Sequence, residues 1–345
     1  MGDTLNAKLA QMVMVGFRGA EPDECRAFLD SLAECPIAGV WLTDNKSPMG
    51  LTHGNIRSPE QVRRLTQALQ NASPTPLFIA IDAEGGQVIR LEECYGFEAF
   101  PSARELGERD DPTFTRSSAE RLARLLAECG INFNFAPVLD LNKNPANPII
   151  AGKHRAFSAD TQTVARHAAI FVEAHHRAGI LCAGKHFPGH GSSSTDSHHG
   201  LVDVTQTWGE DELIPYQHLI ANGLLDAVLT AHVCLRQIDP DLPATLSPRV
   251  VTGLLRERLG FEGVVFTDDL NMGAIQDHYP LERAVELCVQ AGADVVLHAN
   301  VKHYDPDIAR RTVAILRQLV ESGRLTEQRI DQSNQRIAAL RSRIR

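Results

Sequence analysis

The chain has 345 residues, of which 43% are hydrophobic and 22% are charged, and its formal net charge at pH 7 is −9. No apolar run reaches the roughly 18 residues of a membrane span, and a negative charge without a basic stripe excludes a nucleic-acid backbone as partner. Seven scattered cysteines form neither a disulfide framework nor a CxxC pair. Because the first residues also lack the pattern of a secretory leader, we expect a cytoplasmic protein.

Short buried-strand patterns recur along the chain, and each is followed by a segment with helical spacing. Eight runs rich in Val, Ile, Leu and Phe are predicted strands: 11–17, 39–43, 77–82, 131–138, 179–184, 226–232, 263–268 and 293–298. Helices are predicted near 22–33, 58–71, 115–129, 160–177, 210–222, 248–259 and 274–291, with two more at the end. Continuous hydrophobicity along the strands indicates a parallel sheet. The pattern predicts an α/β fold, a single (β/α)8 TIM barrel domain over 1–345, with an open doubly wound sheet as the alternative.

The last predicted helix has one apolar side and one basic side. Its apolar residues are Ile330, Ile337, Leu340 and Ile344. Its basic residues are Arg329, Arg336, Arg341 and Arg343. We expect these arginines to be the solvated side of an amphipathic helix.

Polar side chains gather where four of the predicted strands end: Asp82, Lys185-His186, His232 and Asp268-Asp269. In a (β/α)8 barrel the carboxyl ends of the strands carry the chemistry. Asp268 and Asp269 are adjacent, so their side chains leave the strand on opposite sides and only one can face the barrel mouth. We therefore expect one nucleophile, and we expect Asp269 to cap the following helix.

The loop that follows the fifth strand has the composition of an active-site loop. Residues 184–201 read GKHFPGHGSSSTDSHHGL. In an extended segment Asp196 and His198 project to the same side, so the carboxylate can hold the imidazole by one nitrogen and leave the other free to transfer a proton. The Pro and Gly residues of 188–200 favour a lid that closes over the substrate.

A carboxylate opposite a proton donor is the arrangement for glycosyl transfer through a covalent intermediate. Asp268 would be the nucleophile, and the Asp196-His198 pair would take the place of the usual carboxylic acid donor. The hydroxyl groups of a sugar ring need dense hydrogen bonding. We expect it from Asp82, Arg90, Arg155, Lys185, His186 and His232. With only Trp41 and Trp208 available for stacking, recognition should be mainly polar.

At these motifs the chain resembles a known family. GKHFPGHG followed by DSH, IDAEGGQVIR, APVLDLN, LTAH and GVVFTDDLNM occur in the order seen in the barrel-only bacterial β-N-acetylglucosaminidases of glycoside hydrolase family 3. The resemblance implies a retaining enzyme with Asp268 as nucleophile and His198, paired with Asp196, as acid/base. It also implies sugar contacts from Asp82, Arg90, Arg155 and the Lys185-His186 pair.

The resemblance further implies release of terminal N-acetylglucosamine from muropeptides during peptidoglycan recycling, without a cofactor or metal. Gln87, Ala156 and the serine run 192–194 depart from the usual motifs and bear on the natural substrate rather than the chemistry. Other family 3 activities, a β-glucosidase or a phosphorylase that uses phosphate in place of water, stay open. We expect a small carbohydrate as the only partner, no nucleic acid or membrane, and a monomer or weak homo-oligomer.

Two readings of other classes are also open. A zinc hydrolase on the same barrel would use His186, His190, His198 or His232 as ligands, although no H-x-H closes the first strand. A barrel that binds sugar without catalysis would be expected to have lost Asp268 or the Asp196-His198 pair, and the chain keeps both.

Overall fold

The computed structural model describes residues 4–44, 54–197, 200–301 and 304–344. Its main sheet has eight parallel strands in the order β11-β9-β7-β6-β3-β2-β1-β12. The strands are β1 (Val13–Gly16), β2 (Gly39–Leu42), β3 (Phe78–Ile81), β6 (Phe133–Asn134), β7 (Leu181–Phe187), β9 (Ala227–Thr230), β11 (Val264–Phe266) and β12 (Val296–His298). A parallel bridge between Phe266 and Val295 joins the two ends of this order. All eight predicted strands and the (β/α)8 barrel are confirmed.

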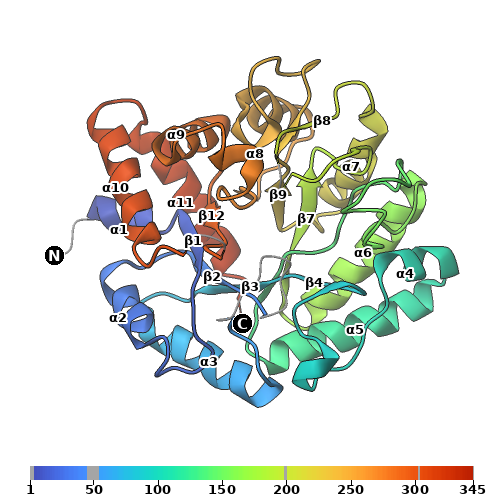
Figure 1. Ribbon diagram of the computed structural model, residues 1–345, viewed down its shortest axis with the longest axis horizontal. Helices are drawn as coiled ribbons and strands as arrows, with labels where there is room; N and C mark the ends of the chain where they lie inside the picture. Colours follow the sequence, from blue (N-terminus) through green and yellow to red (C-terminus); the bar gives the residue numbers. More distant parts are fainter. Residues whose placement is uncertain (1–3, 45–53, 198–199, 302–303, 345) are drawn as a thin grey trace.

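Helices surround the central strands (Figure 1). They are α1 (Thr4–Ala10), α2 (Arg26–Glu34), α3 (Pro59–Ala72), α4 (Ala103–Arg109), α5 (Pro112–Glu128), α6 (Thr161–Arg177), α7 (Ile214–Ala221), the π-helix η4 (Arg249–Arg258), α8 (Gly273–Gln276), α9 (Leu281–Ala291), α10 (Ile308–Glu321) and α11 (Glu327–Arg341). Short 3₁₀ turns lie at η1 (Glu93–Tyr95), η2 (Glu210–Leu213) and η3 (Ala244–Leu246). Side chains of Ser58, Asp111 and Asp160 cap α3, α5 and α6.

The prediction of one helix over 274–291 was wrong. The structure has α8 and α9 there, with Pro280 directly before α9. Proline has no backbone N–H to donate inside a helix and fits at its start, so the segment breaks at this point.

Phenylalanine rings fill the barrel interior. Phe78 of β3 and Phe266 of β11 belong to strands on opposite sides of the barrel, yet their ring centroids are 6.5 Å apart. Phe133 lies between them, 5.6 Å from Phe78 and 5.3 Å from Phe266. These rings therefore point inward, and alternate residues along the same strands share that inward face.

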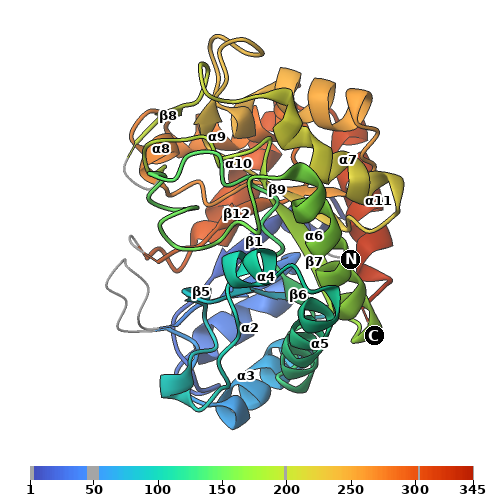
Figure 2. The ribbon, with the colours of Figure 1, turned by 90° about the vertical axis from the view of Figure 1, so that its right-hand side faces the viewer.

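The segments that follow the strands build one end of the barrel. Figure 2 shows the small β-structures and α8 on one side of the barrel and both chain termini on the other. Strands β4 (Ala83–Gly85) and β5 (Val88–Ile89) pair antiparallel, and β8 (Val202–Asp203) pairs with β10 (Val233–Cys234). All of them come after the carboxyl ends of barrel strands, so this side is the expected place for the chemistry.

The arginines of α11 do not form a solvated side as expected. Arg329 and Arg336 reach the buried carboxylate of Asp294, at 3.6 and 3.2 Å, and Arg256 of η4 contacts the same carboxylate at 2.6 Å. The Arg341 guanidinium lies 5.3 Å from the ring of Phe78. The apolar side behaves as predicted, since Ile330, Ile337 and Leu340 are buried. Because Asp294 precedes β12, these contacts fix α11 to the barrel.

We predict that Asp294→Ala strongly destabilises the fold, because it leaves several arginines near the core without their carboxylate. The expected loss is about 3–5 kcal/mol in the free energy of unfolding, measured by urea denaturation. Asp331→Ala is the matched control, since its pair with Lys8 is solvent-exposed on both sides. Equal losses in the two variants would contradict an anchoring role for Asp294.

Candidate active site

A buried lysine joins two carboxylates at the carboxyl end of the barrel. The ammonium group of Lys185, from β7, lies 2.7 Å from Asp82 Oδ1 and 2.6 Å from Glu84 Oε1, and its side chain is 2% exposed. Asp82 follows Ala80 and Phe78 on the inward face of β3, so it points to the barrel mouth. Burial alone would raise the pKa of Asp82, but the charges of Lys185 and Arg90 hold it well below its usual range.

Glu84 and Arg155 extend this cluster toward His186. The guanidinium of Arg155 binds Glu84 with two hydrogen bonds of 2.8 Å and lies 3.1 Å from His186 Nε2. Burial opposes ionisation of Glu84, but Arg155 and Lys185 keep its pKa below the ordinary value. Glu84 is thus an ionised and fully paired carboxylate, which is poorly suited to donate a proton.

Asp140, which sequence reasoning missed, holds His186 and the backbone of His190. Its carboxylate is buried and lies 2.6 Å from His186 Nδ1 and 2.7 Å from the backbone nitrogen of His190. A carboxylate at Nδ1 holds the N–H on that nitrogen, so Nε2 of His186 accepts from the Arg155 guanidinium. The position of Asp140 within the APVLDLN segment, residues 136–142, was the available signal.

Arg90 lies between two carboxylates on the β2 and β3 side of the mouth. Its guanidinium is 3.4 Å from Asp82 and 3.8 Å from Asp44, and Trp41 donates its indole N–H to Asp82 at 3.3 Å. Asp44 is a second residue that sequence reasoning missed, although it ends the β2 segment. Burial and the neighbouring Glu92 carboxyl raise the pKa of Asp44 to about 6, although the positive charge of Arg90 acts to lower it.

Asp268 and Asp269 have different hydrogen-bond partners. Asp268 is two residues beyond the inward-pointing Phe266, so alternation predicts that its side chain continues the inner face. It is partly buried, and its Oδ1 accepts from the Asp269 backbone N–H at 2.8 Å. The expectation that Asp269 caps the next helix was wrong, because the N-cap of α8 is Met272. Asp269 Oδ1 instead accepts from the backbone of Asn271 and Ala299, which ties this turn to the end of β12.

His232 lies deeper than a sugar contact requires. It is fully buried, with Nδ1 2.9 Å from Thr245 Oγ1 and Nε2 3.0 Å from the carbonyl oxygen of Asp269. Both ring nitrogens therefore face protein groups. This geometry favours a role in holding the turn that carries Asp268.

The candidate proton donor, His198, lies outside the described residues, so its pairing with Asp196 stays a prediction. Asp196 itself is partly buried, and its charge acts on the Lys153 ammonium. Burial and the charge of Arg155 lower the pKa of Lys153, while Asp196 opposes that shift. Lys153 is a further cationic residue of the mouth that sequence reasoning did not name.

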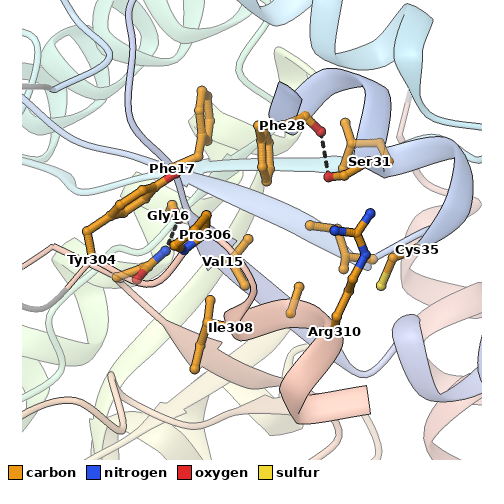
Figure 3. Close-up of a pocket in the computed structure, with 14 residues that line it drawn as sticks. Val15, Gly16, Phe17, Phe28, Ser31, Cys35, Tyr304, Pro306, Ile308 and Arg310 are labelled. Carbon is orange, nitrogen blue, oxygen red and sulfur yellow. Dashed lines mark hydrogen bonds between the residues drawn. The ribbon is translucent and has the colours of Figure 1, made fainter. Parts of the chain in front are cut away.

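Three other features of the described ranges bear on function. No group of three or more His, Cys, Asp or Glu side chains there could hold a metal ion, and no helix there has the length and hydropathy that crossing a membrane requires. A hollow between α2, β1 and α10 is lined by Phe17, Phe28 and Tyr304, with Arg310 at its edge (Figure 3). Its volume of about 20 Å³ admits a water molecule but no sugar.

Comparison with known proteins decides the family. The family model described as the glycosyl hydrolase family 3 N-terminal domain matches residues 4–340. The chain belongs to glycosyl hydrolase family 3. It is 39% identical to a β-hexosaminidase of Alkalilimnicola ehrlichii, with 74% of each chain covered. It is 34% identical to β-hexosaminidase A of Pseudoalteromonas piscicida, where 99% of this chain covers 61% of that protein.

Solved structures of family 3 proteins have the same fold. A β-N-acetylglucosaminidase of Paenibacillus sp. strain FPU-7 is 37% identical with a TM-score of 0.89, and 99% of this chain covers 63% of that one. A β-N-acetylhexosaminidase of Beutenbergia cavernae is 30% identical with a TM-score of 0.84, with 98% of each chain covered. The chain thus spans the full length of one solved relative and under two thirds of another.

Beneath the active-site loop of this family 3 barrel lies a buried carboxyl group. Glu212 of η2 packs against Gly189, where an added Cβ would lie 2.4 Å from Glu212 Oε2. Burial and the negative charge of Asp140 raise the pKa of Glu212 to about 8, while the Ser192 hydroxyl partly offsets them. Glu212 is therefore neutral in the folded protein at pH 7.

This shift predicts a pH-dependent stability. Between about pH 4.5 and 8 the unfolded chain releases the Glu212 proton while the folded chain keeps it, so the protein loses stability as the pH rises, by up to about 1.4 kcal/mol per pH unit. The Gln side chain of Glu212→Gln cannot ionise. The Tm of this variant, relative to that of the unmodified protein, should therefore increase as the pH is raised from 5 to 8. The exposed Glu257→Gln variant is the control. A Tm difference for Glu212→Gln that is the same at both pH values would contradict a neutral Glu212.

Proposed function

We propose that the chain is a retaining β-N-acetylhexosaminidase that removes terminal non-reducing N-acetylglucosamine from β-linked glycosides. The names of the family 3 relatives support this activity. The observation that carries it is the cluster of Asp82, Lys185 and Arg155 at the carboxyl end of the barrel strands, where alternation along β11 would also direct Asp268. A glycosidase needs a carboxylate nucleophile and a set of fixed polar groups that hydrogen-bond the sugar.

In the first step, His198 donates a proton to the glycosidic oxygen while Asp268 attacks the anomeric carbon. The bond between that carbon and the oxygen breaks, the aglycone leaves as an alcohol, and the sugar is esterified to Asp268. In the second step, His198 takes a proton from water, the hydroxide attacks the same carbon, and Asp268 is released. In both steps Asp196 orients the imidazole and stabilises its protonated form.

The sugar hydroxyls are held by the ionised cluster. Asp82 accepts hydrogen bonds, while Lys185, Arg90 and Arg155 donate them, and His186 holds Arg155 in place through Nε2. These groups are already paired with one another, so little reorganisation is needed when sugar replaces solvent. We assign His232 to the support of the Asp268 turn, the one change from the expected set of contacts.

The biological setting follows from the motif resemblance. We propose that the substrate is a muropeptide released during peptidoglycan recycling, that the protein acts in the cytoplasm as a monomer or weak homo-oligomer, and that residues 1–345 are one catalytic domain. Hydrolysis and phosphorolysis share the first step and differ only in the acceptor, so the acceptor must be assayed directly.

The preference for the acetamido sugar is the direct test of this function. A site that hydrogen-bonds the acetamido group leaves buried polar atoms unpaired when the substrate is a plain glucoside, at a cost of about 2–4 kcal/mol in the transition state. The ratio of kcat/KM for p-nitrophenyl N-acetylglucosaminide over the glucoside should therefore be about 30 or more. Parity or a preference for glucose would overturn the hexosaminidase assignment. A rate that rises with added phosphate, with a sugar phosphate as product, would identify a phosphorylase.

A further inference from the structure

The loop after β7 contains a buried histidine that the catalytic scheme does not use. His190 is 2% exposed. Its backbone N–H donates to Asp140 at 2.7 Å, and its carbonyl accepts from Asn147 Nδ2 at 2.8 Å. The same Asp140 holds His186 in the sugar cluster. His190 is thus fixed to the sugar cluster through its backbone.

The ring of His190 then links two hydroxyl groups of the same loop. Nδ1 lies 2.7 Å from Ser193 Oγ, and Nε2 lies 3.3 Å from Ser197 Oγ. Burial lowers the pKa of His190 to about 4, although the Asp140 charge opposes the shift, so the ring is neutral at pH 7. A neutral imidazole has one donor and one acceptor nitrogen, and a hydroxyl group can meet either.

Ser197 is the described residue between Asp196 and His198. Its side chain is buried on His190, and its carbonyl oxygen accepts from the backbone N–H of Ala274 at 3.2 Å. Ala274 belongs to α8, which follows the turn of Asp268. Ser197 is therefore held at two points. Its hydroxyl contacts His190, which is tied to the sugar cluster, and its carbonyl accepts from α8, which follows Asp268.

We propose that His190 is a positioning residue for the proton-transfer step, acting through its Nε2 contact with Ser197. This inference rests on the proposed function. Neighbouring Cα atoms are about 3.8 Å apart, so fixing Ser197 limits the positions open to its neighbour Asp196, the proposed partner of the proton donor. A small misplacement of a catalytic group can lower a rate about a hundredfold. His190 is neutral and buried, and it touches no reacting atom.

Two substitutions separate the two ring contacts. The amide of Asn superimposes on Nδ1 and that of Gln on Nε2, so His190→Gln keeps the contact with Ser197 and His190→Asn keeps the contact with Ser193. Ser197→Ala and Ser193→Ala remove the two partners individually. The four variants are assayed on p-nitrophenyl N-acetylglucosaminide, whose leaving group departs without protonation, and on N,N′-diacetylchitobiose, whose leaving group needs it.

His190→Asn and Ser197→Ala should lose about 10- to 100-fold in kcat/KM on chitobiose and less than about threefold on the nitrophenyl substrate. His190→Gln and Ser193→Ala should stay within about threefold on both. Equal losses on the two substrates, or equal behaviour of the Asn and Gln variants, would overturn the positioning role.

Thermal melts show which variants are folded. If His190→Asn is unfolded, Ser197→Ala decides alone, because it removes a single hydroxyl group. Unmodified protein that is inactive on both substrates would overturn the proposed function and with it this role. Active unmodified protein with uniform losses would overturn the positioning role only.

Discussion

The arrangement of the site depends on one buried ammonium group held between two carboxylates. Lys185 is 2% exposed and contacts both Asp82 and Glu84 within 2.7 Å. Burying charges is costly unless opposite charges compensate one another, so Lys185 needs the two carboxylates and each carboxylate needs the cations around it. Arg155 and Arg90 bring further positive charge to the same carboxylates. The result is a set of hydrogen-bonding groups whose ionisation and position are fixed before substrate arrives.

The barrel supplies this arrangement through the alternation of its strands. Phe78 and Phe266 meet in the interior. Asp82 lies four residues beyond Phe78, on the same face of β3, and the same alternation along β11 predicts that Asp268 points to the mouth. At the other end, Asp294 gathers arginines from η4 and α11. Charged residues thus serve stability at one end of the barrel and chemistry at the other, as is general for this fold.

The sequence was sufficient for the strands and for several of the polar residues that follow them, such as Asp82 and Lys185, because hydrophobic runs and strand-end positions are local signals. Partners that are distant in the chain give no such signal. Asp140 meets His186 across 46 residues, and Asp294 meets Arg336 across 42, so neither pair could be foreseen. This is also why Arg329 and Arg336 were expected in solvent. Asp269 was misassigned because its acceptor role depends on Ala299 of another strand end.

The proposed mechanism requires a covalent bond between Asp268 and the sugar. A 5-fluoro N-acetylglucosaminyl fluoride slows the second step more than the first, so the glycosyl enzyme should accumulate and be found by mass spectrometry of a peptic digest. We predict one added sugar per chain, on the peptide that contains Asp268, and no labelling of an Asp268→Asn variant. A label on a peptide without Asp268, or turnover of the reagent without any covalent adduct, would contradict the role of Asp268 as the nucleophile.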